Sequence, residues 1–141
     1  MGVDAIVPLL CRFSERKELK SERIEKILVS AMKQSLKAVL PRLEEMTPFE
    51  RYVKEEFDGQ KFIAHCHADS ERQLLSQCYK PGSPVRVLIG PEGDFSEDEV
   101  ALAEGKGFKP CSLGASRLRT ETAGVVACHT IHTVNEIAAL E

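Results

Sequence analysis

The chain has 141 residues, of which 43% are hydrophobic and 29% charged; this excludes a disordered protein and fits one domain. A formal net charge of −3 gives no overall attraction to phosphate, so nucleic-acid binding would need a local basic surface. The apolar runs are too short for a membrane span and no leader is visible, so we expect a soluble, cytoplasmic protein.

The N-terminal third predicts a strand followed by two helices. Ala5–Leu10 is a short apolar run typical of a buried strand. Apolar residues then recur at helical spacing after Ser21, a plausible N-cap, until Pro41 ends the pattern. Thr47–Glu50 has the spacing of a capping box with proline at the first helical position, which predicts a second, shorter helix.

The middle third predicts two strands on either side of a helix. Lys61–His65 is typical of a strand. Ser70–Gln73 is a weaker capping box that predicts a helix running toward Tyr79, and Pro81–Pro84 predicts a turn. Val85–Ile89 is the clearest core strand.

The C-terminal third alternates helix and strand. Ser96 and Glu99 form a third capping box, and Gly105–Gly107 supplies candidates for a left-handed C-cap. Pro110–Leu113 predicts a brief strand, and a helical pattern of small and β-branched residues begins near Glu121. The alternation predicts an α/β fold with a parallel sheet covered by helices on both faces.

Two glycine-bearing turns, Leu88–Ser96 and Ser112–Ala123, each follow a predicted strand and lead into a helix. Ligands of α/β sheets bind beyond the carboxyl ends of parallel strands, so we expect one site built from both turns. Neither turn has a Walker or dinucleotide fingerprint. Five acidic residues crowd the first turn and favour a ligand with positive character over a polyphosphate: Glu92, Asp94, Glu97, Asp98 and Glu99. The alternative is a turn that merely starts a helix.

The second turn concentrates polar residues where a loop enters a helix. Arg119 is a candidate for stacking on a nucleobase or contacting a phosphate; the alternative is a surface arginine paired with Glu121. Gly114 permits close approach of a ligand to the backbone, although a simple turn glycine would look the same.

Metal binding and nucleophilic catalysis have little support. His65–His67 alternates around Cys66 as on a strand, and His129 and His132 lack an accompanying carboxylate in a zinc pattern, so we expect no metal. The five cysteines never form a C-x-x-C pair and are expected to be core residues in a reducing compartment: Cys11, Cys66, Cys78, Cys111 and Cys128.

A basic cluster follows the first predicted strand and includes Arg12 and Arg16. A solvated face is the default interpretation, because glutamates are interspersed. Both arginines nevertheless follow the end of a strand, at the same sheet edge as the two turns, where a substrate phosphate would lie.

Several segments share their order and residues with one known family: Leu88–Gly93, Phe95–Val100, Ser112–Gly114 and Leu118–Ala123, with further likeness at Gly2–Pro8 and Lys33–Ser35. Together they closely resemble the signature of the 16S ribosomal RNA uridine-N3-methyltransferases of the SPOUT superfamily. The likeness covers nearly the whole chain.

The resemblance implies a C-terminal trefoil knot, S-adenosylmethionine (SAM) as cofactor, a homodimer joined by C-terminal helices, and 16S ribosomal RNA or the small ribosomal subunit as partner. By match, the cofactor pocket comprises Ile89, Gly90, Gly93, Leu113, Gly114, Leu118, Thr122 and Ala123, and His65 is expected to line it.

The implied chemistry is methyl transfer to uracil N3, whose proton must be removed or whose developing charge must be stabilised. Arg119 is the expected stabilising cation, and Glu121 would orient it or act as a base. Arg12, Arg16 and Arg117 are the expected RNA contacts.

The chain also departs from this family's pattern. Asp94 stands where a second glycine is frequent, and Arg117 where an aliphatic residue is usual. Residues 1–141 are expected to be a SPOUT-type methyltransferase domain that is incomplete at its N-terminal end. The alternative function is a non-catalytic, dimeric α/β binding module derived from this fold.

Overall fold

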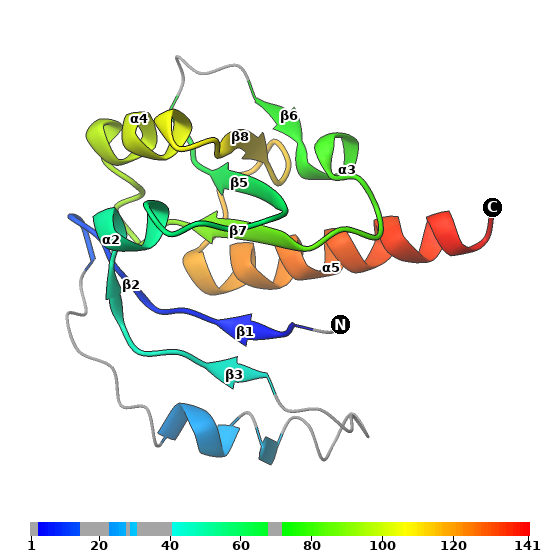
Figure 1. The fold of residues 1–141 in the computed structure, drawn as a ribbon, viewed down its shortest axis with the longest axis horizontal. Helices are drawn as coiled ribbons and strands as arrows, with labels where there is room; N and C mark the ends of the chain where they lie inside the picture. Colours follow the sequence, from blue (N-terminus) through cyan, green and yellow to red (C-terminus); the bar gives the residue numbers. More distant parts are fainter. Residues whose placement is uncertain (1–2, 15–22, 28, 31–40, 68–71) are drawn as a thin grey trace.

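The computed structural model describes residues 3–14, 23–27, 29–30, 41–67 and 72–141. At its centre is a four-stranded parallel sheet in the order β6 (Gln73–Leu74), β8 (Lys109–Ser112), β5 (Gln60–Ala64) and β7 (Val85–Ile89) (Figure 1). Two short parallel pairs come from the N-terminal part: β1 (Ala5–Ile6) with β3 (Arg42–Leu43), and β2 (Leu9–Leu10) with β4 (Thr47–Pro48).

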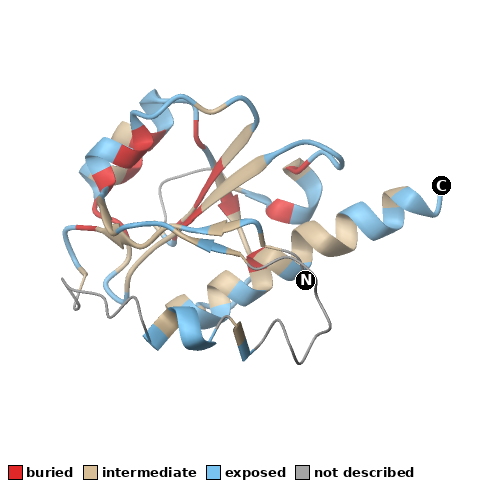
Figure 2. Cartoon of the chain, turned by 60° about the horizontal axis from the view of Figure 1, so that its bottom comes forward, coloured by how far each residue is buried: buried red, intermediate tan, exposed pale blue. Residues whose placement is uncertain are grey.

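Helices cover both faces of the central sheet, as the alternation of the sequence predicts. The helices are α2 (Phe49–Val53), α3 (Leu75–Cys78), α4 (Glu97–Gly105) and α5 (Thr120–Ala139), and residues 23–27 and 29–30 are also helical. On β5, Ile63 packs with α2 and α4, whereas its neighbour Phe62 packs on the opposite face with α3 and α5. Figure 2 shows buried residues gathered on the sheet and on α4.

The predicted buried strand Ala5–Leu10 is instead two strands of two residues each. Pro8 has no N–H to donate to a continuous ladder, so the pairing changes partner there, from β3 to β4. The segment is also only partly buried, with Ile6 38% exposed. The predicted single core strand was therefore wrong in both continuity and burial.

Two of the three predicted capping boxes are wrong. The Thr47 hydroxyl donates to the Glu45 carbonyl, and α2 begins one residue later than expected, without a side-chain cap. Gln73 lies in β6 and α3 begins only at Leu75, so no helix starts at the predicted box; Ser70 lies outside the described residues. In both cases a short strand takes the residues that the pattern assigned to a helix start.

Predictions for the C-terminal third are confirmed closely. Ser96 Oγ accepts from the Glu99 N–H at 3.1 Å, and Glu99 Oε1 accepts from the Ser96 N–H at 2.9 Å. Gly107 has the left-handed φ of +92° that ends α4. Strand β8 and helix α5 each begin one residue before the predicted position.

Other sequence predictions have mixed outcomes. Of the long helix predicted from Ser21 to Pro41, residues 23–27 and 29–30 are helical and the rest lies outside the described residues. Cys11 and Cys111 are buried, whereas Cys66 is exposed, so the expectation of a core cysteine is wrong there. No helix within the described ranges is long and apolar enough to cross a bilayer.

Candidate functional site

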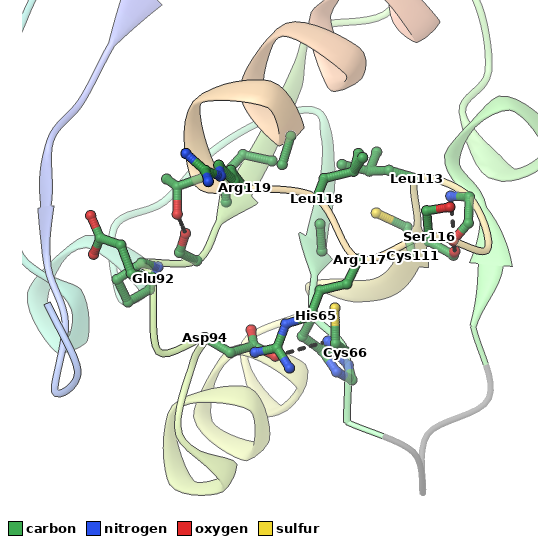
Figure 3. A pocket seen from close by; sticks show the side chains of 18 of the residues that line it. His65, Cys66, Glu92, Asp94, Cys111, Leu113, Ser116, Arg117, Leu118 and Arg119 are labelled. Carbon is green, nitrogen blue, oxygen red and sulfur yellow. Dashed lines mark hydrogen bonds between the residues drawn. The ribbon is translucent and has the colours of Figure 1, made fainter.

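The two glycine-bearing turns line one cavity of about 610 Å³ (Figure 3). It lies beyond the carboxyl ends of β5, β7 and β8, which meet at one edge because these strands are parallel. The segments after β5, β7 and β8 supply its walls, and the start of α5 supplies a further part. The predicted convergence of both turns on one cavity is therefore confirmed.

Most residues expected at the site line this cavity. These are His65, Ile89, Gly90, Leu113, Gly114, Arg117, Leu118, Arg119, Glu121 and Ala123. Gly93 and Thr122 are not among the lining residues. Gly93 faces outward, where an added Cβ would lie 2.8 Å from the Cβ of Phe13, and Thr122 is exposed on the first turn of α5. Arg12 also lies outside the lining, and Arg16 is not among the described residues.

A hydrogen bond that sequence reasoning missed joins the two turns. The Thr120 hydroxyl, at the start of α5, donates to the Gly90 carbonyl of the first turn at 2.8 Å. This contact spans 30 positions in the chain, so no local pattern signals it. It fixes the distance between the two walls that carry the sequence resemblance.

Asp94 joins the first turn to the segment after β5. Its Oδ2 accepts from the Cys66 N–H at 3.0 Å and its Oδ1 accepts from the Phe95 N–H at 2.8 Å. Asp94 has a φ of +65°, the left-handed region that favours glycine and that aspartate tolerates better than most residues. Glycine would adopt this conformation without strain, whereas aspartate adopts it here with two hydrogen bonds accepted by its carboxylate.

His65 is a buried histidine in the cavity wall, only 3% exposed. Its Nδ1 accepts from the His67 N–H at 3.2 Å, so the neutral ring carries its proton on Nε2. Burial, with the nearby Arg72 cation and His67, lowers the pKa of His65 below its ordinary value. Nε2, which is itself buried, has no hydrogen-bond partner within the described part of the chain.

Arg72 is a lining residue that the sequence did not single out. Its guanidinium donates to the His65 carbonyl and holds the end of β5. His67 fixes the same wall to the first turn, because its Nε2 lies 2.6 Å from the Phe95 carbonyl, which only accepts. Neither contact has a sequence signal, since both depend on how the loops fold back.

Arg117 and Arg119 are exposed and line the cavity. Neither makes a hydrogen bond or ion pair with any described residue, so the structure does not contain the alternative pairing of Arg119 with Glu121. Their guanidinium groups remain available to a ligand. Gly114, with a φ of +139°, shapes the loop that precedes them.

No group of three or more histidine, cysteine, aspartate or glutamate side chains in the described ranges has an arrangement that could hold a metal ion. Carboxylates, guanidinium groups, backbone groups and the His65 imidazole line the cavity.

Comparisons with known proteins agree with this geometry. Residues 1–132 match the family described as an RNA methyltransferase domain. The chain is 31% identical over 129 residues to ribosomal RNA small subunit methyltransferase E of Rickettsia conorii, an alignment that covers 90% of this chain and 52% of that protein. It thus spans about half the length of the curated relatives it matches.

Two solved structures share the fold. A probable rRNA-methyltransferase from Porphyromonas gingivalis is 46% identical with a TM-score of 0.91, over 97% of this chain and 58% of that one. A putative methyltransferase from Legionella pneumophila, solved with the bound cofactor SAM, is 29% identical with a TM-score of 0.81, over 94% of this chain and 56% of that one. The chain belongs to the RNA methyltransferase domain family, with relatives named ribosomal RNA small subunit methyltransferase E.

Proposed function

We propose that the chain is the cofactor-binding part of a SAM-dependent methyltransferase that acts on N3 of a uridine in small-subunit (16S) ribosomal RNA. The observation that carries the proposal is the single cavity lined by both motif-bearing turns. Family membership and the SAM complex of the Legionella pneumophila relative support it.

The cavity suits this cofactor in size and chemistry. Its volume of about 610 Å³ falls within the range of small-molecule sites. Ile89, Leu113 and Leu118 offer apolar contacts, while Gly90 and Gly114 leave backbone groups accessible. Glu92 and Asp94 add negative charge that favours a cationic ligand. When bound, SAM supplies an electrophilic methyl group on a sulfonium.

Arg119 is the proposed catalytic cation. Uracil N3 carries its proton at neutral pH, so the reaction develops negative charge on the base as that proton leaves. An exposed guanidinium at the cavity, with no partner among the described residues, is available to stabilise this charge. Glu121 lines the same cavity without an ion pair to Arg119, which favours proton acceptance over orientation as its role.

The remaining parts of the proposal come from the family resemblance. They are a trefoil knot at the C-terminal segment, a homodimer through α5, and RNA contacts by Arg12, Arg16 and Arg117. Arg12 lies near the first turn, since its N–H donates to Glu99 at the start of α4. The rival function, a non-catalytic dimeric binding module, shares the fold and the dimer and lacks cofactor binding.

Calorimetry with S-adenosylhomocysteine (SAH), the demethylated form of the cofactor, tests the site first. We expect saturable one-site binding that Gly114→Val abolishes, because valine at a φ of +139° distorts the wall. Gly105→Val is the matched control, since Gly105 has no atom within 4 Å of an added Cβ and lies outside the cavity. A folded wild-type chain that does not bind SAH would favour the binding module.

Methyl transfer to small-subunit RNA tests the role of Arg119. We expect Arg119→Ala to keep SAH affinity within about twofold and to reduce the transfer rate by about 100-fold, because it removes stabilisation needed only in the transition state. Equal losses of SAH affinity and rate would instead assign Arg119 to cofactor binding.

A further inference from the structure

Phe13 is an exposed aromatic side chain near the cavity. It is 45% exposed, whereas Phe49, Phe62, Phe95 and Phe108 are each at most 3% exposed. A single exposed ring is not by itself a binding surface, so the case for Phe13 depends on what surrounds it.

The turn that carries Phe13 is held in place by the fold. Cys11 is buried in the core between α2 and α4, and its N–H donates to Ser14 Oγ at 3.0 Å. The Arg12 N–H donates to Glu99 Oε2 of α4 at 3.1 Å. Phe13 is therefore positioned by bonds on both sides of it.

Gly93 allows this turn to lie directly against the first glycine-bearing turn. An added Cβ at Gly93 would lie 2.8 Å from the Phe13 Cβ, a distance that real Cβ contacts do not show. The neighbours of Gly93 in the chain, Glu92 and Asp94, both line the cavity. Phe13 thus stands on the outer side of the same turn whose inner side forms the cavity wall.

A cation accompanies the ring. The guanidinium carbon of Arg12 lies 5.6 Å from the centre of the Phe13 ring. An exposed ring beside a guanidinium combines a π-face for a base with a positive charge for a phosphate, the pairing used to hold single-stranded nucleic acid. Arg117 and Arg119 add two further cations at the cavity. The cavity lining also includes the carboxylates of Glu92, Asp94 and Glu121.

We propose that Arg12 and Phe13 form a stacking ledge for an unpaired RNA base that neighbours the uridine in the cavity. The proposal rests on the proposed function for its RNA substrate. An enzyme that modifies a base must hold that base out of its helix, and stacking of an adjacent base on an aromatic side chain stabilises the opened strand. Phe13 reaches this position through Gly93, whose neighbours Glu92 and Asp94 line the cavity.

Tryptophan fluorescence tests the ledge directly, because the chain has no tryptophan. Phe13→Trp places the only indole of the protein on the ledge. We expect a short uridine-containing oligoribonucleotide to quench its emission saturably, and inorganic polyphosphate, which has no bases, to leave it unquenched. Leu140→Trp is the control, since Leu140 is 88% exposed at the far end of α5 and its indole should not respond.

Affinity measurements complete the test. We expect Phe13→Ala to weaken binding of the oligoribonucleotide about tenfold and Phe13→Tyr to keep it within about twofold, because stacking requires a ring. Absence of quenching in Phe13→Trp, or quenching by polyphosphate alone, would overturn the ledge even if Phe13→Ala failed to fold. SAH binding is measured on the same variants and is expected to stay unchanged. If the wild-type chain did not bind SAH, the proposed cofactor would be contradicted. Quenching of the indole in Phe13→Trp, in contrast, tests only the ledge.

Discussion

Asp94 combines three properties in one residue of the cavity wall. Its left-handed backbone makes the turn, its carboxylate fixes Cys66 and Phe95, and its charge faces a proposed cationic ligand. Glycine would supply only the first of these. Aspartate adds the negative charge and the two hydrogen bonds. Adopting this left-handed backbone would cost most other non-glycine residues a conformational free energy of about 1–2 kcal/mol. Aspartate is thus compatible with this turn.

His65 predicts a pH dependence of stability. Its pKa is lowered from 6.5 by burial, with Arg72 and His67 nearby, so the unfolded chain takes up this proton at a higher pH than the folded chain. Neutral His65 contributes fully to the free energy of unfolding above about pH 6.5. This contribution is lost as the pH falls through the pKa of His65 in the folded chain. We therefore expect the free energy of unfolding, measured with urea, to decrease as the pH is lowered from neutral to mildly acidic.

The exposed His129 supplies the control for this dependence. His65→Asn should flatten the fall in the free energy of unfolding, and His129→Asn should leave it unchanged. NMR titration of the His65 ring gives a direct readout, and a midpoint at or above 6.5 would contradict the interpretation.

Among the secondary-structure elements, α2 and α4 show that similar sequences start helices differently. Both are preceded by a residue pattern typical of a capping box, yet only Ser96 caps its helix. Thr47 does not, because the N-cap of α2 is Pro48, one residue later; Thr47 lies in β4, where its N–H donates to the Pro8 carbonyl at 2.9 Å. Pairing with β2 therefore takes precedence over the local capping signal.

This difference predicts unequal effects of two alanine substitutions. Ser96→Ala should lower the free energy of unfolding by about 1 kcal/mol, because the buried start of α4 loses its cap. Thr47→Ala should lower it by less than about 0.5 kcal/mol, because its hydroxyl bonds only to the nearby Glu45 carbonyl. Urea unfolding monitored by circular dichroism measures both, and equal losses would contradict the assignment of the cap.

At the scale of the whole molecule, α5 leaves apolar side chains uncovered. Val125 and Ile137 are each 55% exposed, and helical geometry places them within about a third of the helix circumference. One face of the helix packs on α3 and the sheet. The exposed apolar side chains agree with the proposed homodimer through α5.

Sedimentation velocity tests the proposed dimer. We expect the chain to show a concentration-dependent dimer, and Ile137→Glu to raise its dissociation constant at least about tenfold by placing a charge in the interface. Leu74→Glu, a matched change of an exposed leucine on β6, should leave the dimer intact. A wild-type chain that stays monomeric would contradict the proposed assembly.

The strongest predictions from sequence were those with dense local signals. Ser96, Glu99 and Gly107 mark the ends of α4, and β7 is apolar apart from Arg86, so their predicted bounds were close to those observed. The N-terminal strands were not predictable in this way. Leu9 pairs with Thr47, 38 positions away in the sequence. The residue pattern within about ten residues of either position does not indicate this pairing.

The sequence by itself determined the alternation of strands and helices and the two turns, because helix caps, turn glycines and apolar spacing act over a few residues. Only the tertiary structure decided that Thr120 bonds to Gly90, that Asp94 bonds to Cys66, and that Phe13 rests on Gly93. These contacts depend on chain segments 28, 30 and 80 positions apart meeting at one edge of the sheet. That meeting follows from parallel strand order, which local preferences do not encode.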